Sequence, residues 1–233
     1  MRHCAWLALA AVAAASAGHS ADLTGFWKIV TPVAELKTDD GQVPPLRPAA
    51  LELYDLRKAR FAQGDRRYDP TQTCRPIGEP RVMYEGQPFQ IIQTPKVLVF
   101  RYTWNRLDHL LYADTTKSLG VPTYFGSGTL HWDGRTLQLK LGDFHDTTLL
   151  DAAGMPHSGA LQLTERFNLS GDGKALTETI LFNDPQVFMH PWSATFHYRR
   201  QNLVDLPEDV CEQRMKLFAH AVPKAANPSP QTR

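Results

Sequence analysis

Residues 158–182 read SGALQLTERFNLSGDGKALTETILF, and this stretch decides the fold. Two runs in it alternate apolar and polar residues at a period of two, which is typical of half-buried β-strands. The glycines of Gly171-Asp172-Gly173 favour a turn between the runs. Each run also places a glutamate in its apolar row, Glu165 in the first and Glu178 in the second. The stretch therefore predicts a β-hairpin whose two strands both direct a carboxyl group into the core.

These two inward carboxyl groups need a physical explanation, because burying an ionised carboxylate costs several kcal/mol unless it is paired or solvated. One explanation is structural, with a buried arginine or tyrosine as the partner of the acid. The other is functional, with the acids as polar groups on the apolar wall of a ligand cavity. Arg166 points to the opposite face of its strand from Glu165, so it is a poor partner, whereas Tyr102, Tyr198 or a buried water could satisfy the carboxyl group.

The rest of the chain predicts an all-β fold. From Phe89 onward, short strands separated by turn signals about every ten residues favour an antiparallel meander. We expect this meander to close into a lipocalin-like barrel or a strongly curved sheet. Ala49 to Ala62 is the one convincing helix, and it should pack outside the barrel or across one end. The expected organisation is an N-terminal strand, loop and helix packing on the barrel (residues 22–88), a barrel core (residues 89–212) and a tail (residues 213–233).

Residues 1–21 have the features of a secretory signal peptide. Arg2 and His3 give a positive start, an apolar run follows, and Ala15-Ser16-Ala17 is a small-residue cleavage site. We therefore expect a periplasmic or secreted protein without a membrane-spanning segment. Cys74 and Cys211 are the cysteines that remain after cleavage. An even number in an oxidising compartment favours a disulfide between them, with two free thiols as the alternative.

Composition narrows the possible partners. The 25 basic and 24 acidic residues give a formal net charge of +1, so electrostatics provides no reason to expect nucleic acid or anionic lipid as a partner. The sequence has no glycine-rich phosphate-binding loop and no Cys-x-x-Cys pair, so we expect no cofactor. His145, Asp146 and His157 match no compact metal-ligand spacing, so no metal is expected either.

Two further predicted hairpins determine which face of the sheet His109 and His131 occupy. If Asn105-Arg106 forms a turn, Tyr102 opposes His109 and Phe100 opposes Leu111, which puts His109 in an apolar row. A single histidine on such a face is more often a satisfied core residue than a catalyst. In the second hairpin, Asp133-Gly134 has the chemistry of a two-residue type I′ turn. That turn would pair Leu130 with Leu137 and leave His131 on the other face.

The candidate site residues fall into three groups. Glu165, His109 and Glu178 are the inward candidates for acid/base chemistry. His145, Asp146, His157 and Ser158 lie on a loop that we expect at an open end of the barrel. Tyr102, Trp132 and Trp192 complete the candidate ligand-binding residues.

Several short motifs together resemble a family of exported bacterial proteins of unknown function. They are Cys74-x-Pro-x-Gly-x-Pro-Arg, Gly126-x-Gly-x-x-x-Trp-Asp-Gly-x-Thr-Leu, Gly154-Met-Pro-His-Ser, Glu165-Arg166 and Asp184-Pro185 with Pro191-Trp192. The resemblance covers roughly Cys74 to Cys211. The chain departs from the family pattern at Asp133 and Arg135, where the family has Glu and Asp. The resemblance implies export and a β-rich fold, and it implies no particular activity.

These observations lead to one functional hypothesis and two alternatives. A glutamate in an apolar cavity has a raised pKa, and a nearby histidine can exchange a proton with it. We therefore expect a small, mostly apolar substrate and cofactor-independent chemistry of the isomerase, lyase or cyclase type, with Glu165 as the acid/base. The first alternative is a lipocalin-like binder without catalysis. The second is an interaction module that recruits a partner through an exposed strand bearing Trp192 and Tyr198.

Overall fold

The computed structural model describes residues 20–113 and 120–221, with the side chains of residues 217–221 left aside. The signal peptide predicted for residues 1–21 lies almost entirely outside these ranges. None of the helices in the described part is long and apolar enough to cross a membrane.

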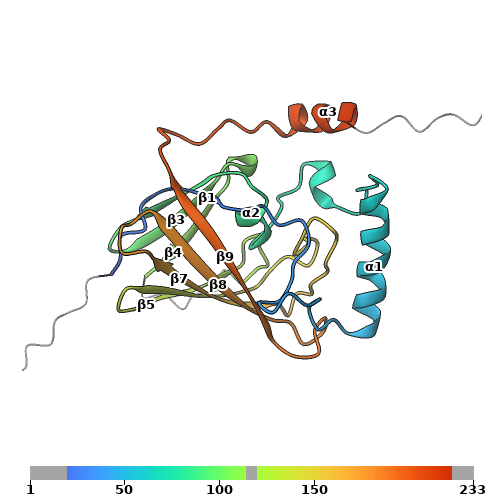
Figure 1. Cartoon of the computed structure of the whole chain (residues 1–233), viewed down its shortest axis with the longest axis horizontal. Coiled ribbons are helices and arrows are strands. Elements are labelled where there is room, and N and C mark those ends of the chain that lie inside the picture. Colours follow the sequence, from blue (N-terminus) through green and yellow to red (C-terminus); the bar gives the residue numbers. More distant parts are fainter. Residues whose placement is uncertain (1–19, 114–119, 222–233) are drawn as a thin grey trace, which may run out of the picture.

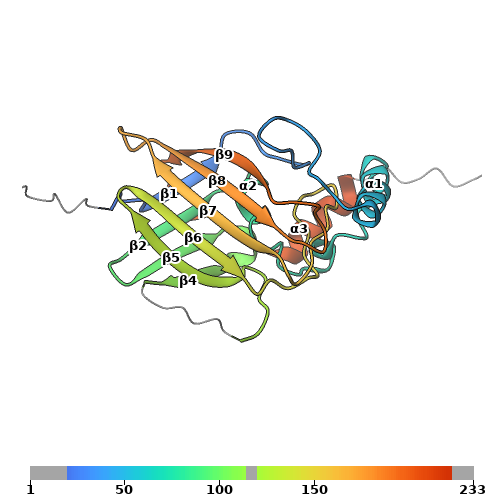
Figure 2. The ribbon, with the colours of Figure 1, turned by 90° about the horizontal axis from the view of Figure 1, so that it is seen from below.

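Nine strands form one antiparallel sheet that curls into a nearly closed barrel (Figures 1 and 2). The strands follow one another across the sheet in the order β4-β3-β2-β1-β9-β8-β7-β6-β5. Their bounds are β1 Gly25–Ile29, β2 Phe89–Gln93, β3 Val97–Tyr102, β4 Asp108–Tyr112, β5 Ser127–Asp133, β6 Thr136–Gly142, β7 Gln162–Leu169, β8 Ala175–Asn183 and β9 Trp192–Gln201. The predicted all-β antiparallel meander is confirmed.

The N-terminal strand was expected to pack against the barrel. It is instead one of the strands that form the barrel sheet. β1 pairs with β2 on one side and with β9 on the other. It therefore joins two meanders, β1 to β4 and β5 to β9, into one sheet. Trp27 in the middle of β1 is fully buried, so the strand contributes to the core as well as to the hydrogen-bonded ladder.

The barrel has a seam between β4 and β5. Neighbouring strands alternate in direction, so the first and last of nine run the same way and can meet only as a parallel pair. Across this seam the described residues form one isolated parallel bridge, between Ala113 and Leu130. The seam is therefore the place where the barrel is least completely closed.

The hairpin of residues 158–182 forms as predicted. Glu165 lies opposite Ile180, and Glu178 lies opposite Phe167, so both acids occupy the inward rows of β7 and β8. Arg166 is exposed on the outer face. Because the side-chain period is two, this register fixes both carboxyl groups inside the barrel.

The other two registers differ from the prediction by two residues. In the β3–β4 hairpin Phe100, not Tyr102, lies opposite His109. The connection is longer than two residues because the Tyr102 N–H donates to the Leu107 carbonyl at 2.9 Å, across a short 3-10 turn at Trp104–Arg106. A shift of two keeps every side chain on its face, so His109 still points inward.

In the β5–β6 hairpin Leu130 pairs with Leu139 instead of Leu137. Asp133 pairs with Thr136, so Gly134 and Arg135 form the two-residue loop. Gly134 has a φ of 58°, which a glycine adopts without strain. His131 is exposed on the outer face, as predicted.

The predicted helix is confirmed as α1, Pro48–Ala62, which lies beside one end of the barrel (Figures 1 and 2). Of its residues only Tyr54 is buried, whereas the apolar side chains of Leu51 and Leu56 are exposed. The Tyr54 hydroxyl donates to Asp151 Oδ2 at 2.7 Å. The helix is therefore held by a buried polar contact more than by a continuous apolar face.

Two helices were not predicted. The short α2, Arg81–Tyr84, is fully buried, and α3, Cys211–Ala221, begins at the end of the expected barrel core and continues into the expected tail. A further 3-10 turn covers Pro70–Thr73. A four-residue helix such as α2 contains too few residues to show a helical period in the sequence.

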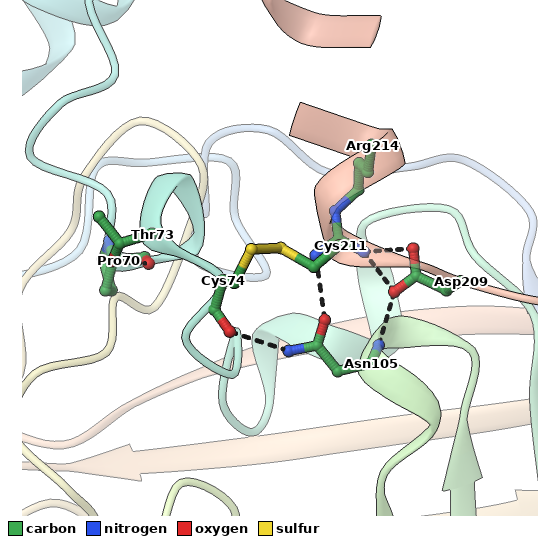
Figure 3. The surroundings of a disulfide bond; sticks show 7 residues. All are labelled: Pro70, Thr73, Cys74, Asn105, Asp209, Cys211 and Arg214. Carbon is green, nitrogen blue, oxygen red and sulfur yellow. Dashed lines mark hydrogen bonds and ion pairs between the residues drawn. A yellow bond between two sulfur atoms is a disulfide. The ribbon is translucent and has the colours of Figure 1, made fainter. Parts of the chain in front are cut away.

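The predicted disulfide between Cys74 and Cys211 is present and joins α3 to the segment between α1 and β2 (Figure 3). The two Cα atoms are 5.7 Å apart. Asn105 lies beside the bond: its backbone N–H donates to Asp209 Oδ2 at 2.6 Å, and its Oδ1 accepts from Arg214 Nη2 at 3.1 Å. The C-terminal helix is thus fixed by one covalent bond and a small polar network.

Removing the disulfide should lower stability, because it closes a loop of 137 residues. In the chain-entropy model a loop of this size contributes up to about 4–5 kcal/mol to the free energy of unfolding. A Cys74→Ala, Cys211→Ala variant should therefore unfold at a lower urea concentration than the oxidised wild type, and reduced wild type should behave like the variant. Equal midpoints for all three samples would show that the bond does not stabilise the fold.

Candidate functional site

The barrel interior holds three buried carboxyl groups, from Glu79, Glu165 and Glu178, which we call the acid cluster. Glu165 comes from β7 and Glu178 from β8, while Glu79 comes from the loop before α2. The surrounding core is aromatic, with Phe89, Phe100, Tyr102, Phe167 and Tyr198 all buried. The arrangement thus places titratable groups where an all-apolar core would be expected.

Glu178 is partly satisfied. The Tyr198 hydroxyl donates to its Oε2 at 2.5 Å, and its Oε1 has no partner among the residues that the structure describes. Burial raises the pKa of Glu178 to about 8, although the hydrogen bond from Tyr198 acts in the opposite direction. For this acid the structural explanation, a tyrosine partner, is sufficient.

Glu165 is fully buried, and neither of its carboxyl oxygens has a hydrogen-bond partner within the described ranges. Burial raises its pKa well above the usual value, and the negative charges of Glu79 and Glu178 add to this effect. Tyr102 and Tyr198, the tyrosines expected near Glu165, bind the other two acids instead. Glu165 is therefore a buried carboxyl group that favours its protonated form and has no partner among the described residues.

Glu79 was not predicted as a site residue. Its N–H donates to the Tyr124 carbonyl at 3.0 Å, and its Oε2 accepts from the Tyr102 hydroxyl at 2.5 Å. Burial raises the pKa of Glu79 to about 8. Glu79 lies in a proline-rich loop without hydrophobic periodicity. The alternating apolar pattern that identified Glu165 and Glu178 is therefore missing there. The place of Glu79 inside the motif from Cys74 to Arg81 is the one sequence signal that could have drawn attention to it.

His109 on β4 connects the acid cluster to the seam. Its Nδ1 lies 3.8 Å from Glu79 Oε2, beyond hydrogen-bond distance, and its Nε2 has no partner among the described residues. Burial lowers the pKa of His109 to about 4, so the imidazole is neutral at physiological pH. The ring stacks against Phe125 with a centroid separation of 5.8 Å.

A cavity of about 330 Å³ follows the seam, and we call it the seam cavity. It lies between β4 and the segment that leads into β5, and its lining includes His109, Leu111, Phe125, Gly126 and Gly128. The lining also includes the polar residues Asp108, Tyr112, Thr123 and Ser127. The cavity therefore combines a largely apolar wall with several polar groups, among them an imidazole whose Nε2 has no partner among the described residues.

The loop of residues 143–158 lies at the barrel end that faces α1 and does not join the acid cluster. His157 is buried, with Nε2 2.7 Å from Thr148 Oγ1. Ser158 donates from its N–H and its hydroxyl to Asp184. Asp146 is exposed, and the half-exposed His145 stacks on Tyr124 at 5.1 Å. His157 and Ser158 therefore stabilise the loop.

The two predicted tryptophans also lie away from the acids. Trp132 on β5 is half-buried against the core, and Trp192 on β9 is buried and stacks on Phe182 at 4.1 Å. Tyr198 is fully buried as well. The hypothesis of an exposed recruiting strand with Trp192 and Tyr198 is therefore wrong, since both side chains are used to fill the barrel.

Comparison with protein-family models gives no match, and no curated protein matches the chain significantly. The resemblance to an exported bacterial family stays a prediction. Among the described residues no three histidine, cysteine, aspartate or glutamate side chains are grouped as metal ligands. The candidate functional site consists of the acid cluster, His109 and the seam cavity.

The acid cluster should make the protein less stable as the pH rises from about 7 to about 8. Unfolded glutamates are ionised in this range, whereas the folded acids favour their protonated forms, because the pKa values of Glu79 and Glu178 are about 8 and that of Glu165 is raised well above its usual value. Each such group lowers the free energy of unfolding by up to about 1.4 kcal/mol per pH unit. The lowered pKa of His109 has the opposite effect, because it makes the free energy of unfolding rise with pH. This effect is confined to pH values below about 7, where the histidine of the unfolded chain titrates.

Urea denaturation across this range measures the slope. Glu165→Leu removes one of the raised pKa values and an unpaired buried carboxyl group, so it should flatten the slope and raise stability at the alkaline end. Glu52→Gln on the exposed surface of α1 is the control and should leave the slope unchanged. A wild-type stability that stays constant or rises with pH would contradict the assignment of buried neutral acids.

Proposed function

We propose that this is an exported barrel that binds a small, mostly apolar molecule in the seam cavity, with His109 as its polar contact. The observation that carries the proposal is the position of His109: it lines the cavity, its Nδ1 lies 3.8 Å from Glu79 Oε2, and its Nε2 has no partner among the described residues. A buried polar atom without a partner costs about 1–3 kcal/mol, and a ligand group could satisfy it.

The dimensions and chemistry of the seam cavity support a small ligand. Its volume of about 330 Å³ is at the lower end of the range usual for ligand pockets. Leu111 and Phe125 offer apolar contact, and the ring of Phe125 also contacts Tyr102 at 5.2 Å. Export is supported by the Cys74–Cys211 disulfide, since such bonds persist in oxidising compartments, and by the predicted signal peptide.

A second candidate function is acid/base catalysis on that molecule, of the isomerase, lyase or cyclase type. It is favoured by the proximity of a neutral imidazole and a carboxylic acid whose pKa is about 8. With the proton of His109 on Nε2, this N–H can donate to a ligand, and Nδ1 can take a proton from Glu79 once the 3.8 Å between Nδ1 and Oε2 closes to hydrogen-bond distance. Glu165 lies deeper than this pair and is not among the residues that line the seam cavity. We therefore propose His109, and not Glu165, as the acid/base in direct contact with the substrate.

The proposal predicts that His109→Phe reduces ligand retention. Protein purified from the periplasm and extracted into organic solvent should yield a small, mostly apolar molecule by mass spectrometry for the wild type. Phenylalanine keeps the ring that stacks on Phe125 but removes Nε2, and loss of this hydrogen bond should weaken binding at least tenfold, or about 1.4 kcal/mol. The matched control is His131→Phe, the same substitution on the exposed face of β5. Equal retention by both variants would rule out the seam cavity as the site.

Glu79→Gln separates the two candidate functions once the molecule is known. Glutamine can still accept the hydrogen bond from Tyr102 but cannot give a proton to His109. A binding protein should keep its affinity in this variant. An enzyme should keep binding but lose turnover of the bound molecule, measured by the ratio of product to substrate.

A further inference from the structure

A second cavity, with a volume of about 520 Å³, lies outside the barrel between α1 and two loops. One loop contains residues 67–75 and the other residues 146–157. Three arginines line it, Arg57 from α1 and Arg67 and Arg75 from the first loop, and we call it the arginine pocket. Two segments singled out in the sequence, the one that begins at Cys74 and the Gly154-Met-Pro-His-Ser motif, therefore meet at one cavity.

Positive charge in the arginine pocket is not cancelled by its acids. Arg57 and Arg75 form no ion pair with any described carboxylate, whereas Arg67 is paired with Asp65 at 2.9 Å. Asp69 also lines the pocket, but its carboxylate is taken by the buried Arg81 at 2.7 Å. The remaining acid in the lining is the exposed Asp146. The pocket therefore offers two guanidinium groups that lack an acidic partner.

Arg57 is held in position by the second loop. Its Nη1 donates to the Gly154 carbonyl at 3.0 Å, which uses one of the five donors of the guanidinium. Gly154 has a φ of 105°, and a Cβ there would lie 2.5 Å from Cβ of Arg57. A glycine is thus required for this close approach. The loop itself is fixed by the buried Asp151, whose Oδ1 accepts from the N–H groups of Gly154 and Met155 at 2.9 Å each.

The rest of the lining is suited to the body of a small organic molecule. Leu53, Leu149 and Pro156 give apolar contact, and Tyr68, whose hydroxyl donates to the Ala152 carbonyl at 3.2 Å, gives a ring edge. The volume is within the range of small-molecule sites. Arginine recognises planar or tetrahedral oxyanions through paired N–H donors, and a partly buried guanidinium binds them more strongly than an exposed one.

We propose that the arginine pocket binds a small organic molecule through an oxyanion group, a carboxylate or a phosphate, held between Arg57 and Arg75. This site is separate from the seam cavity and does not depend on the function proposed for it. The apolar part of the molecule lies against Leu53 and Leu149.

Isothermal titration of the full mature protein at low ionic strength tests this proposal with three probes: inorganic phosphate, benzoate and the neutral benzamide. The wild type should bind at least one of the two anions, and the tighter of them identifies the oxyanion. Benzamide, which has the shape of benzoate without its charge, should bind at least tenfold more weakly than benzoate if the carboxylate is the group recognised.

The variants locate the site. Arg75→Gln removes an exposed guanidinium without a structural ion pair, so it should fold normally and weaken anion binding at least tenfold. Arg135→Gln, in the exposed β5–β6 loop, removes the same charge far from the pocket and should bind like the wild type. The proposal is overturned if neither anion binds the wild type, or if Arg75→Gln and Arg135→Gln bind equally well.

Discussion

An antiparallel barrel with an odd number of strands has to close between two strands that run in the same direction, and this constraint shapes the rest of the molecule. Here β4 and β5 are those strands, and a parallel pair cannot be joined by a tight turn. The described part of the seam contains one bridge, between Ala113 and Leu130. Closure is consequently weakest beside His109 and Phe125, which is where the seam cavity lies.

The acid cluster follows from a second constraint, the two-residue period of a strand. Once Leu163, Phe167, Leu176 and Ile180 are buried, Glu165 and Glu178 have to be buried with them. Two tyrosines compensate for this with one hydroxyl each, for Glu79 and for Glu178. Glu165 receives none, so the fold contains a group that lowers its stability whenever it ionises. A core selected for stability alone would have an apolar residue at this position.

The sequence allowed the β7–β8 hairpin, the disulfide and α1 to be predicted, because each depends on a local pattern or on pairing two cysteines. The two other hairpin registers were each wrong by two residues, because the number of residues in a turn depends on backbone geometry that sequence motifs specify weakly. A register error of two residues leaves each side chain on the same face of the sheet, so His109 was correctly placed inside the barrel. The position of β1 between β2 and β9 depends on long-range pairing that no local pattern encodes.

The candidate site was predicted in part for the same reason. Glu165, Glu178, Tyr102 and His109 lie in strand rows, and the structure brings them together in the interior. Glu79 lies in a loop, where burial is set by tertiary packing and not by periodicity. His157 and Ser158 were expected at a cavity mouth because loops often carry function. The structure uses them for contacts with Thr148 and Asp184 that hold the loop together.

The most direct test of this account is the protonation state of Glu165. In protein labelled with ¹³C at the glutamate side-chain carboxyl, the resonance that disappears in Glu165→Gln belongs to this residue. The account predicts that at about pH 7 this carbon still has the chemical shift of a protonated acid, because burial raises the pKa of Glu165 well above its usual value. A carboxylate shift at that pH, with a titration near the ordinary pKa of about 4.3, would contradict it.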